Sequence, residues 1–189
     1  DGRWAKFNDS FRNQELEFMD IANAIYSGRA YTAWHNGRRK DENFVCAQHI
    51  AVDMETHDKY SSIEYLASMD FVRAYGGLIH TTPSHKPDDP RSRVIFFLDT
   101  PITDGAAYEV AARFIYSIFP GADIACIDSS RFFYGSLNCQ IEWIDNVLPM
   151  AHLRSFYARH GKREQTQARP RSAVAQPARQ AATVQSPGS

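Results

Sequence analysis

Residues 44–55 read Phe44-Val-Cys-Ala-Gln-His-Ile-Ala-Val-Asp-Met-Glu55, an apolar run that ends in two acids. The short length and the apolar, β-branched content are typical of a buried strand. Alternate residues of a strand project from one face, so Asp53 and Glu55 are expected side by side. Two such carboxylates repel each other unless a cation lies between them, and hard oxygen ligands suit Mg²⁺ or Mn²⁺. The alternative is a strand that simply ends in solvent with two exposed acids.

Further strands and helices are expected on both sides of this run. The patterns predict short strands over 78–82, 93–98 and 131–134, and helices over 12–27, 61–75, 104–118 and 141–159. Strands and helices that alternate between irregular loops indicate an α+β fold, with helices packed on a mixed or antiparallel sheet. We therefore expect one folded domain over residues 1–159.

Residues 160–189 differ from the rest in composition. This segment is rich in Gln, Ala, Arg and Pro, lacks periodicity, and carries five basic residues against a single acid, Glu164. It is too poor in apolar residues to pack, so we expect a disordered basic tail or a linker. Because the formal net charge of the chain is -1, the body before it is acidic, at about -5. An acidic body does not fit a protein that grips duplex DNA over a wide basic face.

The cysteines, the hydropathy and the start of the chain bear on the cellular compartment and on the extent of the protein. Cys46, Cys126 and Cys139 form no CxxC pair, so neither a structural zinc site nor a disulfide framework is indicated. Buried, reduced thiols in a cytoplasmic protein are expected instead. No apolar run approaches the roughly 18 residues of a membrane span. The chain starts without an initiator methionine, so we expect a piece of a longer protein.

A second polar group follows the strand expected at 78–82. Ser84, His85 and Lys86 stand in a proline-rich loop, and Arg91 and Arg93 follow it. Arginine can grip a phosphate with two hydrogen bonds, whereas lysine acts as a point charge. The loop is therefore a candidate phosphate clamp, and the alternative is a proline-rich surface turn.

A third polar group lies around the extended segment at 131–134. Asp123 and Asp128 precede Arg131, and a Gly-Ser turn then leads to Asn138. Such a segment offers a further metal ligand and more phosphate donors. The alternative is an acidic loop that leads into an edge strand.

Taken together and in this order, the three groups resemble the archaeo-eukaryotic primase (AEP) superfamily. That superfamily is marked by an acid-x-acid pair after an apolar strand, then a Ser/His element, then a hydrophobic residue followed by Asp. The matching segments are Val52-Asp53-Met54-Glu55, Ser84-His85 and Ala122-Asp123. The spacing from Asp123 to Arg131, and the segment from Ser84 to Leu98, are similar to primase-polymerases of plasmids, phages and integrated elements. The resemblance covers roughly residues 44–140.

The sequence also departs from the superfamily pattern. Ser84 and His85 are adjacent rather than separated by one residue, and no basic residue follows the Gly-Ser turn. Asp128 and Asp99 compete with Asp123 as the third acid, and the spacing to Arg131 favours Asp123.

The resemblance implies an RRM-like sheet that carries the acids. Asp53, Glu55 and Asp123 would be the catalytic residues and the ligands of two Mg²⁺ or Mn²⁺ ions. Ser84, His85, Arg93 and Arg131 would bind the nucleotide, with Lys86, Arg91 and Asn138 as weaker candidates. The implied function is template-directed nucleotidyl transfer, as a DNA primase or DNA polymerase. Its partners would be a single-stranded DNA template, NTPs or dNTPs, and a helicase or accessory domain outside this chain.

Two other functions remain open. A replication-initiator nicking endonuclease needs a His-hydrophobe-His metal pair, but His80 and His85 are five positions apart and His49 stands alone. A non-catalytic, RRM-like module that binds single-stranded nucleic acid would stack bases on aromatic side chains, for which Phe132, Phe133 and Tyr134 are candidates.

Overall fold

The computed structural model describes residues 2–155, 158 and 182–185. Its helices are α1 (Gly2–Asp9), α2 (Phe18–Tyr26), α3 (Ile63–Ser68), α4 (Asp70–Tyr75) and α5 (Gly105–Tyr116), followed by a helical stretch that begins at residue 150. The long strands are β4 (Phe44–Met54) and β6 (Ser92–Ile102). The short strands are β1 (Phe11–Gln14), β2 (Tyr31–Thr32), β3 (Trp34–His35), β5 (Leu78–Thr81), β7 (Phe132–Phe133), β8 (Ile141–Trp143), β9 (Val147–Leu148) and β10 (Ala182–Gln185).

Two sheets organise these strands. The larger has six strands, in the order β3-β4-β6-β5-β8 with β9 parallel to β6, and the smaller has the order β1-β10-β2-β7. The centre of the large sheet is the antiparallel pair β4 and β6, whose register places Asp53 opposite Arg93. In antiparallel strands, residues directly opposite each other share a face, so these two side chains start from the same side of the sheet.

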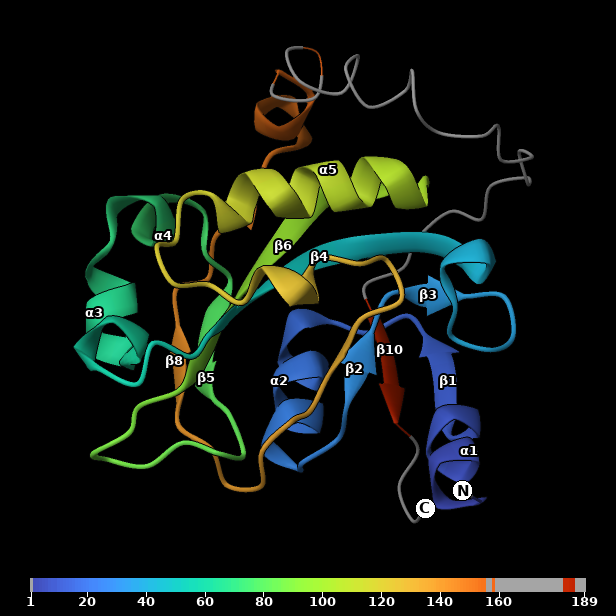
Figure 1. Cartoon of the computed structure of the whole chain (residues 1–189). Helices are drawn as coiled ribbons and strands as arrows, with labels where there is room; N and C mark the ends of the chain where they lie inside the picture. Colours follow the sequence, from blue (N-terminus) through green and yellow to red (C-terminus); the bar gives the residue numbers. More distant parts are fainter. Residues whose placement is uncertain (1, 156–157, 159–181, 186–189) are drawn as a thin grey trace.

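Helices cover both faces of the large sheet, with α5 above it and α2 below it in Figure 1. On the α2 face, the ring of Phe18 stacks on that of Phe97, with 4.0 Å between centroids. On the α5 face, the ring of Phe96 meets that of Phe119. Residues 94–98 of β6 are almost wholly buried, so this strand forms the centre of the core. Burial on both faces explains its nearly unbroken apolar sequence.

Several predicted elements are confirmed. The strand predicted at 44–53 is β4, and the strands predicted at 78–82 and 93–98 are β5 and β6. The helix predicted at 104–118 is α5, which begins where the Asp104 carboxylate accepts a hydrogen bond from the Ala107 amide. The mixed sheet with packed helices agrees with the predicted α+β class.

Three helix predictions need correction. The helix predicted at 12–27 is shorter, because residues 11–14 form strand β1 instead. The helix predicted at 61–75 is two helices, broken at Met69, whose backbone is extended. Residues 141–148, predicted as the start of a closing helix, form strands β8 and β9. Pairing with β5 and β6 outweighs the local helical pattern there, and helix begins only at residue 150, after Pro149.

Most of the predicted tail, 160–189, lies outside the described residues. Within it, β10 is described, and this strand pairs with β1 on one side and β2 on the other. The domain boundary at residue 159 stays a prediction. Within the part of the chain that the structure describes, every helix is too short or too polar to cross a bilayer.

Candidate active site

Asp53 lies at the end of β4 and is bound to Arg93 of β6. The Arg93 Nη2 and Nε atoms lie 2.7 Å and 2.9 Å from the same carboxylate oxygen, Asp53 Oδ1. Asp53 is 7% exposed and Arg93 is 5% exposed. A buried charge needs a partner, so each of these two residues satisfies the other. The second carboxylate oxygen, Asp53 Oδ2, is left to face its neighbours across the site.

Asp123 reaches Asp53 through the backbone that precedes it. Gly121 has a φ of +87°, which favours glycine, and a Cβ there would come within 2.3 Å of the Thr56 side chain. This turn lets Ala122 form a bridge with Met54, and the Asp123 amide donates a hydrogen bond of 3.0 Å to the Asp53 carbonyl. The main chain thus joins the two acids, although they are 70 positions apart in sequence.

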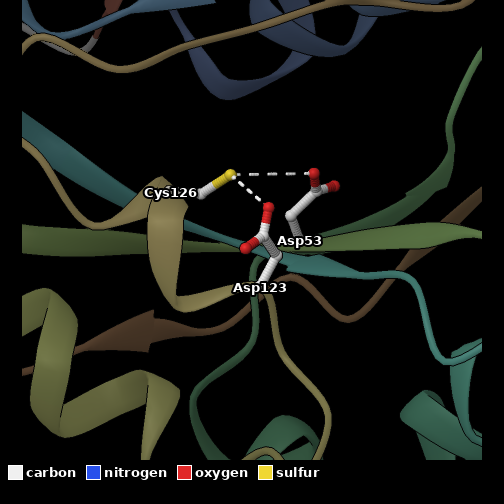
Figure 2. A group of neighbouring side chains, drawn as sticks. All are labelled: Asp53, Asp123 and Cys126. Carbon is white, nitrogen blue, oxygen red and sulfur yellow. Dashed lines mark hydrogen bonds between the residues drawn. The ribbon is translucent and has the colours of Figure 1, made fainter.

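Cys126 faces both carboxylates. Figure 2 shows the three side chains turned toward one another, with the Cys126 sulfur 3.3 Å from Asp123 Oδ2 and 4.0 Å from Asp53 Oδ2. The three potential ligand atoms lie within 4.8 Å of one another. Burial, with the Asp53 charge as the next cause, raises the pKa of the Cys126 thiol to about 12. At neutral pH the sulfur is therefore a protonated donor, and the hard ligands here are the two carboxylates, which suit Mg²⁺ or Mn²⁺.

Glu55 lies beside this cluster rather than within it. It follows the end of β4, and its carboxylate forms an ion pair of 3.7 Å with Arg91. The Glu55 side chain is 38% exposed, so it borders the site from the solvent side.

A cavity of about 510 Å³ opens next to the acids. Its lining residues are Asp53, Glu55, Thr82, Pro83, Ser84, Arg93, Arg131, Phe132, Phe133 and Tyr134. This volume lies within the usual range for small-molecule sites. Of the seven predicted site residues, five line this one cavity. Asp123 is not among the lining residues of the cavity but lies close to Asp53, which is. His85 does not line this cavity.

His85 turns toward a neighbouring cavity of about 520 Å³, which it lines together with Lys59 and Asp88. Its Nδ1 accepts a hydrogen bond of 3.2 Å from the Arg91 amide, so it holds the base of the loop at 83–91. Ser84, its neighbour, faces the first cavity. The adjacent positions of Ser84 and His85 thus place them on two different surfaces.

The two acids that compete with Asp123 for the role of third ligand accept hydrogen bonds from other groups. Asp128 accepts from Arg131 Nε at 3.0 Å and from the Ser130 hydroxyl at 2.9 Å. Asp99 accepts a hydrogen bond from the Met150 amide at the far end of β6. Among the described residues, the cluster of metal-type donors contains Asp123 but neither competitor. It also contains no histidine, which the nicking-endonuclease alternative requires.

Sequence reasoning missed the buried residues behind Arg93. His80 of β5 lies opposite Arg93 in the sheet, and its Nε2 is 3.1 Å from the Tyr31 hydroxyl. Its Nδ1 lies 3.0 Å from the Thr81 carbonyl, so Nδ1 carries the proton and Nε2 accepts from Tyr31. The Tyr31 hydroxyl also interacts with the Arg93 guanidinium. A histidine and a tyrosine within apolar segments were the available signal, but the contact depends on strand pairing.

Comparisons with known proteins agree with this geometry at the level of the fold. No protein-family model and no curated protein matches the sequence. A solved structure, the AEP domain (PP-N190) of the primase-polymerase (PrimPol) of cyanophage S-2L, matches with a TM-score of 0.50 and 11% sequence identity. The match covers 78% of this chain and 98% of the phage domain. The resemblance predicted from the sequence is thereby confirmed for the fold, and this chain has the fold of an AEP primase-polymerase domain.

Proposed function

We propose that this domain catalyses template-directed, metal-dependent nucleotidyl transfer, as a DNA primase, a DNA polymerase or both. One observation carries the proposal: in a chain with the AEP fold, the carboxylates of Asp53 and Asp123 meet beside a cavity that Arg93 and Arg131 line. In this reaction a hydroxyl oxygen attacks the α-phosphorus of a nucleoside triphosphate, loses its proton, and displaces pyrophosphate. The substrates would be NTPs or dNTPs, paired to a single-stranded DNA template.

The acids fit a divalent ion, and the chain itself explains how they are held. Asp53 and Asp123 would be its ligands, with Glu55 joining them if its ion pair with Arg91 is exchanged for the ion. When bound, Mg²⁺ or Mn²⁺ lowers the pKa of an attacking hydroxyl and offsets charge on the transferred phosphoryl group. Arg93 fixes the orientation of the Asp53 carboxylate through Oδ1 and leaves Oδ2 facing the Cys126 sulfur within the cluster.

The cations around the cavity suit a triphosphate. Arg131 lines it with a side chain that is 35% exposed, so its guanidinium can meet a phosphate from the solvent side. The Ser84 side chain, which also lines the cavity, offers a neutral hydrogen-bond donor. His85 belongs to the proposed nucleotide-binding set through the loop that it holds, since its imidazole accepts from the Arg91 amide.

Asp123 gives the sharpest test, because its substitution leaves the Arg93–Asp53 pair intact. We expect Asp123→Asn to lower primer extension on a single-stranded template with Mg²⁺ or Mn²⁺ by at least about a hundredfold, since it removes a carboxylate ligand of the proposed metal ion, whose charge stabilises the transition state. The matched control is Asp99→Asn, which keeps an oxygen to accept from the Met150 amide and should extend primers normally. A reaction without primer shows whether the domain also starts chains.

The alternative function predicts a different result. Phe132, Phe133 and Tyr134 line the same cavity, as a module that only binds nucleic acid would require. If the wild-type domain forms no product with either metal but retains single strands equally well with and without EDTA, the binding module replaces the polymerase. If Asp123→Asn and Asp99→Asn extend primers equally, the proposed metal site is wrong.

A further inference from the structure

Five aromatic rings form one cluster beside the cavity. They come from α1, β1 and the segment around β7, and we call them the aromatic surface: Trp4, Phe7, Phe11, Phe132 and Tyr134. The Phe7 ring lies at the centre, 5.4 Å from Trp4, 5.3 Å from Phe11, 5.1 Å from Phe132 and 5.7 Å from Tyr134 between centroids. The contacts join segments that are more than 100 positions apart in sequence.

Two of these rings remain open to solvent. Trp4 is 51% exposed and Tyr134 is 46% exposed, although the other three rings are partly covered. The surface is also continuous with the proposed active site, because Phe132 and Tyr134 line the cavity that holds Asp53. Exposed rings at the mouth of a cavity suggest a ligand with flat, apolar faces of its own.

Basic residues are frequent in the segments that carry the aromatic surface and in the loop that contacts it, although Lys40 of that loop forms an ion pair with Glu42. Residues 2–14 and 36–40 carry six basic residues and one acid, Asp9. The basic ones are Arg3, Lys6, Arg12, Arg38, Arg39 and Lys40. This local excess contrasts with the acidic balance of the rest of the folded body, so the positive charge is concentrated where the rings are exposed.

Arg39 joins the basic loop at 36–40 to the rings. Its guanidinium lies 4.5 Å from the centroid of the Phe132 ring, and its Nη2 donates to Asn8 Oδ1 at 2.7 Å. It also donates to the Ser130 carbonyl, and Arg38 forms an ion pair of 3.6 Å with Asp9. The loop is therefore held against α1 and the segment before β7, and its charges stay beside the rings.

From this arrangement we infer that the aromatic surface and the basic residues of these segments bind single-stranded nucleic acid that leads into the cavity. Bases of a single strand expose flat faces that stack on aromatic rings, and the phosphates between them pair with lysine and arginine. A duplex hides those faces. A protein partner would need acidic side chains beside its apolar contact to match the basic residues of these segments. The inference rests on the proposed function only in taking the bound strand to be the template.

The test measures binding without catalysis. A fluorescein-labelled oligo-dT probe is titrated with the domain in EDTA and followed by fluorescence anisotropy, with an oligo-U probe and a duplex as further arms. We expect Trp4→Ala and Tyr134→Ala each to raise the Kd for oligo-dT about tenfold or more, the size of one lost base stack. Trp4→Phe keeps a ring and should bind nearly as the wild type does. Lys6→Gln should lower the salt dependence, with a slope smaller by about 0.7.

Controls separate stacking from folding and from catalysis. Tyr60→Ala removes a ring that is 43% exposed and whose centroid lies 5.3 Å from Lys59 Nζ, in the 3-10 turn Lys59–Ser61 before α3. Because α3 and α1 lie at opposite ends of the molecule in Figure 1, this variant should not change the Kd. Circular dichroism melting checks that the variants fold.

Equal Kd values for wild type, Trp4→Ala and Tyr134→Ala would overturn the inference, as would a preference for duplex. A preference for oligo-U over oligo-dT would assign the surface to RNA. If Asp123→Asn binds oligo-dT normally and the wild type never extends a primer, the proposed function is wrong. The inference that the aromatic surface binds single strands is then retained.

Discussion

Two arginine–aspartate pairs border the same cavity, and they differ in burial. The side chains of Arg93 and Asp53 are 6% and 10% exposed, whereas those of Arg131 and Asp128 are each 35% exposed. The first pair joins two central strands, and the second lies three positions apart in one loop. A buried pair cannot exchange partners cheaply, but a half-exposed pair can. The comparison suggests that Arg93 holds the proposed catalytic acid, Asp53, in place, whereas Arg131 is available to a ligand.

The largest expected effect is at the buried pair. Asp53→Ala leaves the Arg93 charge buried without its carboxylate, so we expect the free energy of unfolding to fall by about 3–5 kcal/mol and extension activity to disappear. Urea unfolding followed by circular dichroism measures the first effect. A variant with a wild-type midpoint would show that Arg93 finds another acceptor and that the pair does not hold the site together.

A smaller effect is expected from pH, through the residues behind Arg93. Burial, with the Arg93 charge as the next cause, lowers the pKa of His80 from 6.5 to about 3. Between these two pKa values, His80 therefore binds a proton in the unfolded chain but not in the folded chain. This contribution to stability is complete above pH 6.5 and is lost as the pH falls toward 3. Between pH 7 and pH 5 the loss should be about 2 kcal/mol.

Denaturant midpoints across this pH range measure that loss, with His80→Gln as the matched variant. Glutamine cannot titrate here, so its stability should vary less between pH 7 and pH 5 than that of the wild type. The same dependence in both proteins would mean that other groups cause it. His35, whose pKa burial also lowers, is the first of these to examine.

The smallest effect on stability is expected at the exposed pair. Arg131→Ala should change the free energy of unfolding by less than about 1 kcal/mol, because exposed ion pairs contribute little. If its guanidinium binds phosphate, the KM for the nucleotide should rise about tenfold, with a smaller change in kcat. Steady-state extension kinetics against nucleotide concentration separate the two constants. An unchanged KM would leave Arg131 with the structural role of holding Asp128.

The sequence predicted the central strands well, because their patterns are local. β4 and β6 carry apolar runs that burial on both faces explains, and Asp53 and Arg93 were singled out at their ends. The helix predictions were wrong where strands lie at 11–14 and 141–148, because these strands pair with segments that are distant in the sequence. Their sequences alone look helical, and only the neighbouring strands decide otherwise.

The same limit applies to the candidate site. Spacing within one segment singled out Asp53 and Glu55, and the resemblance, with its spacing to Arg131, favoured Asp123. Neither could show that Glu55 pairs with Arg91 or that Cys126 faces both carboxylates. Nor could either show that Arg39 lies on Phe132. Each of these contacts joins residues brought together by a turn or by strand pairing, and side-chain reach depends on that geometry.

The hydrogen bond from the Asp123 amide to the Asp53 carbonyl has a wider consequence. The distance between the backbones of the two acids is set by main-chain pairing, as is the distance between paired residues on adjacent strands. The Asp123 side chain can therefore be exchanged by design without this backbone pairing being lost, whereas the buried Arg93 charge requires an acid at Asp53.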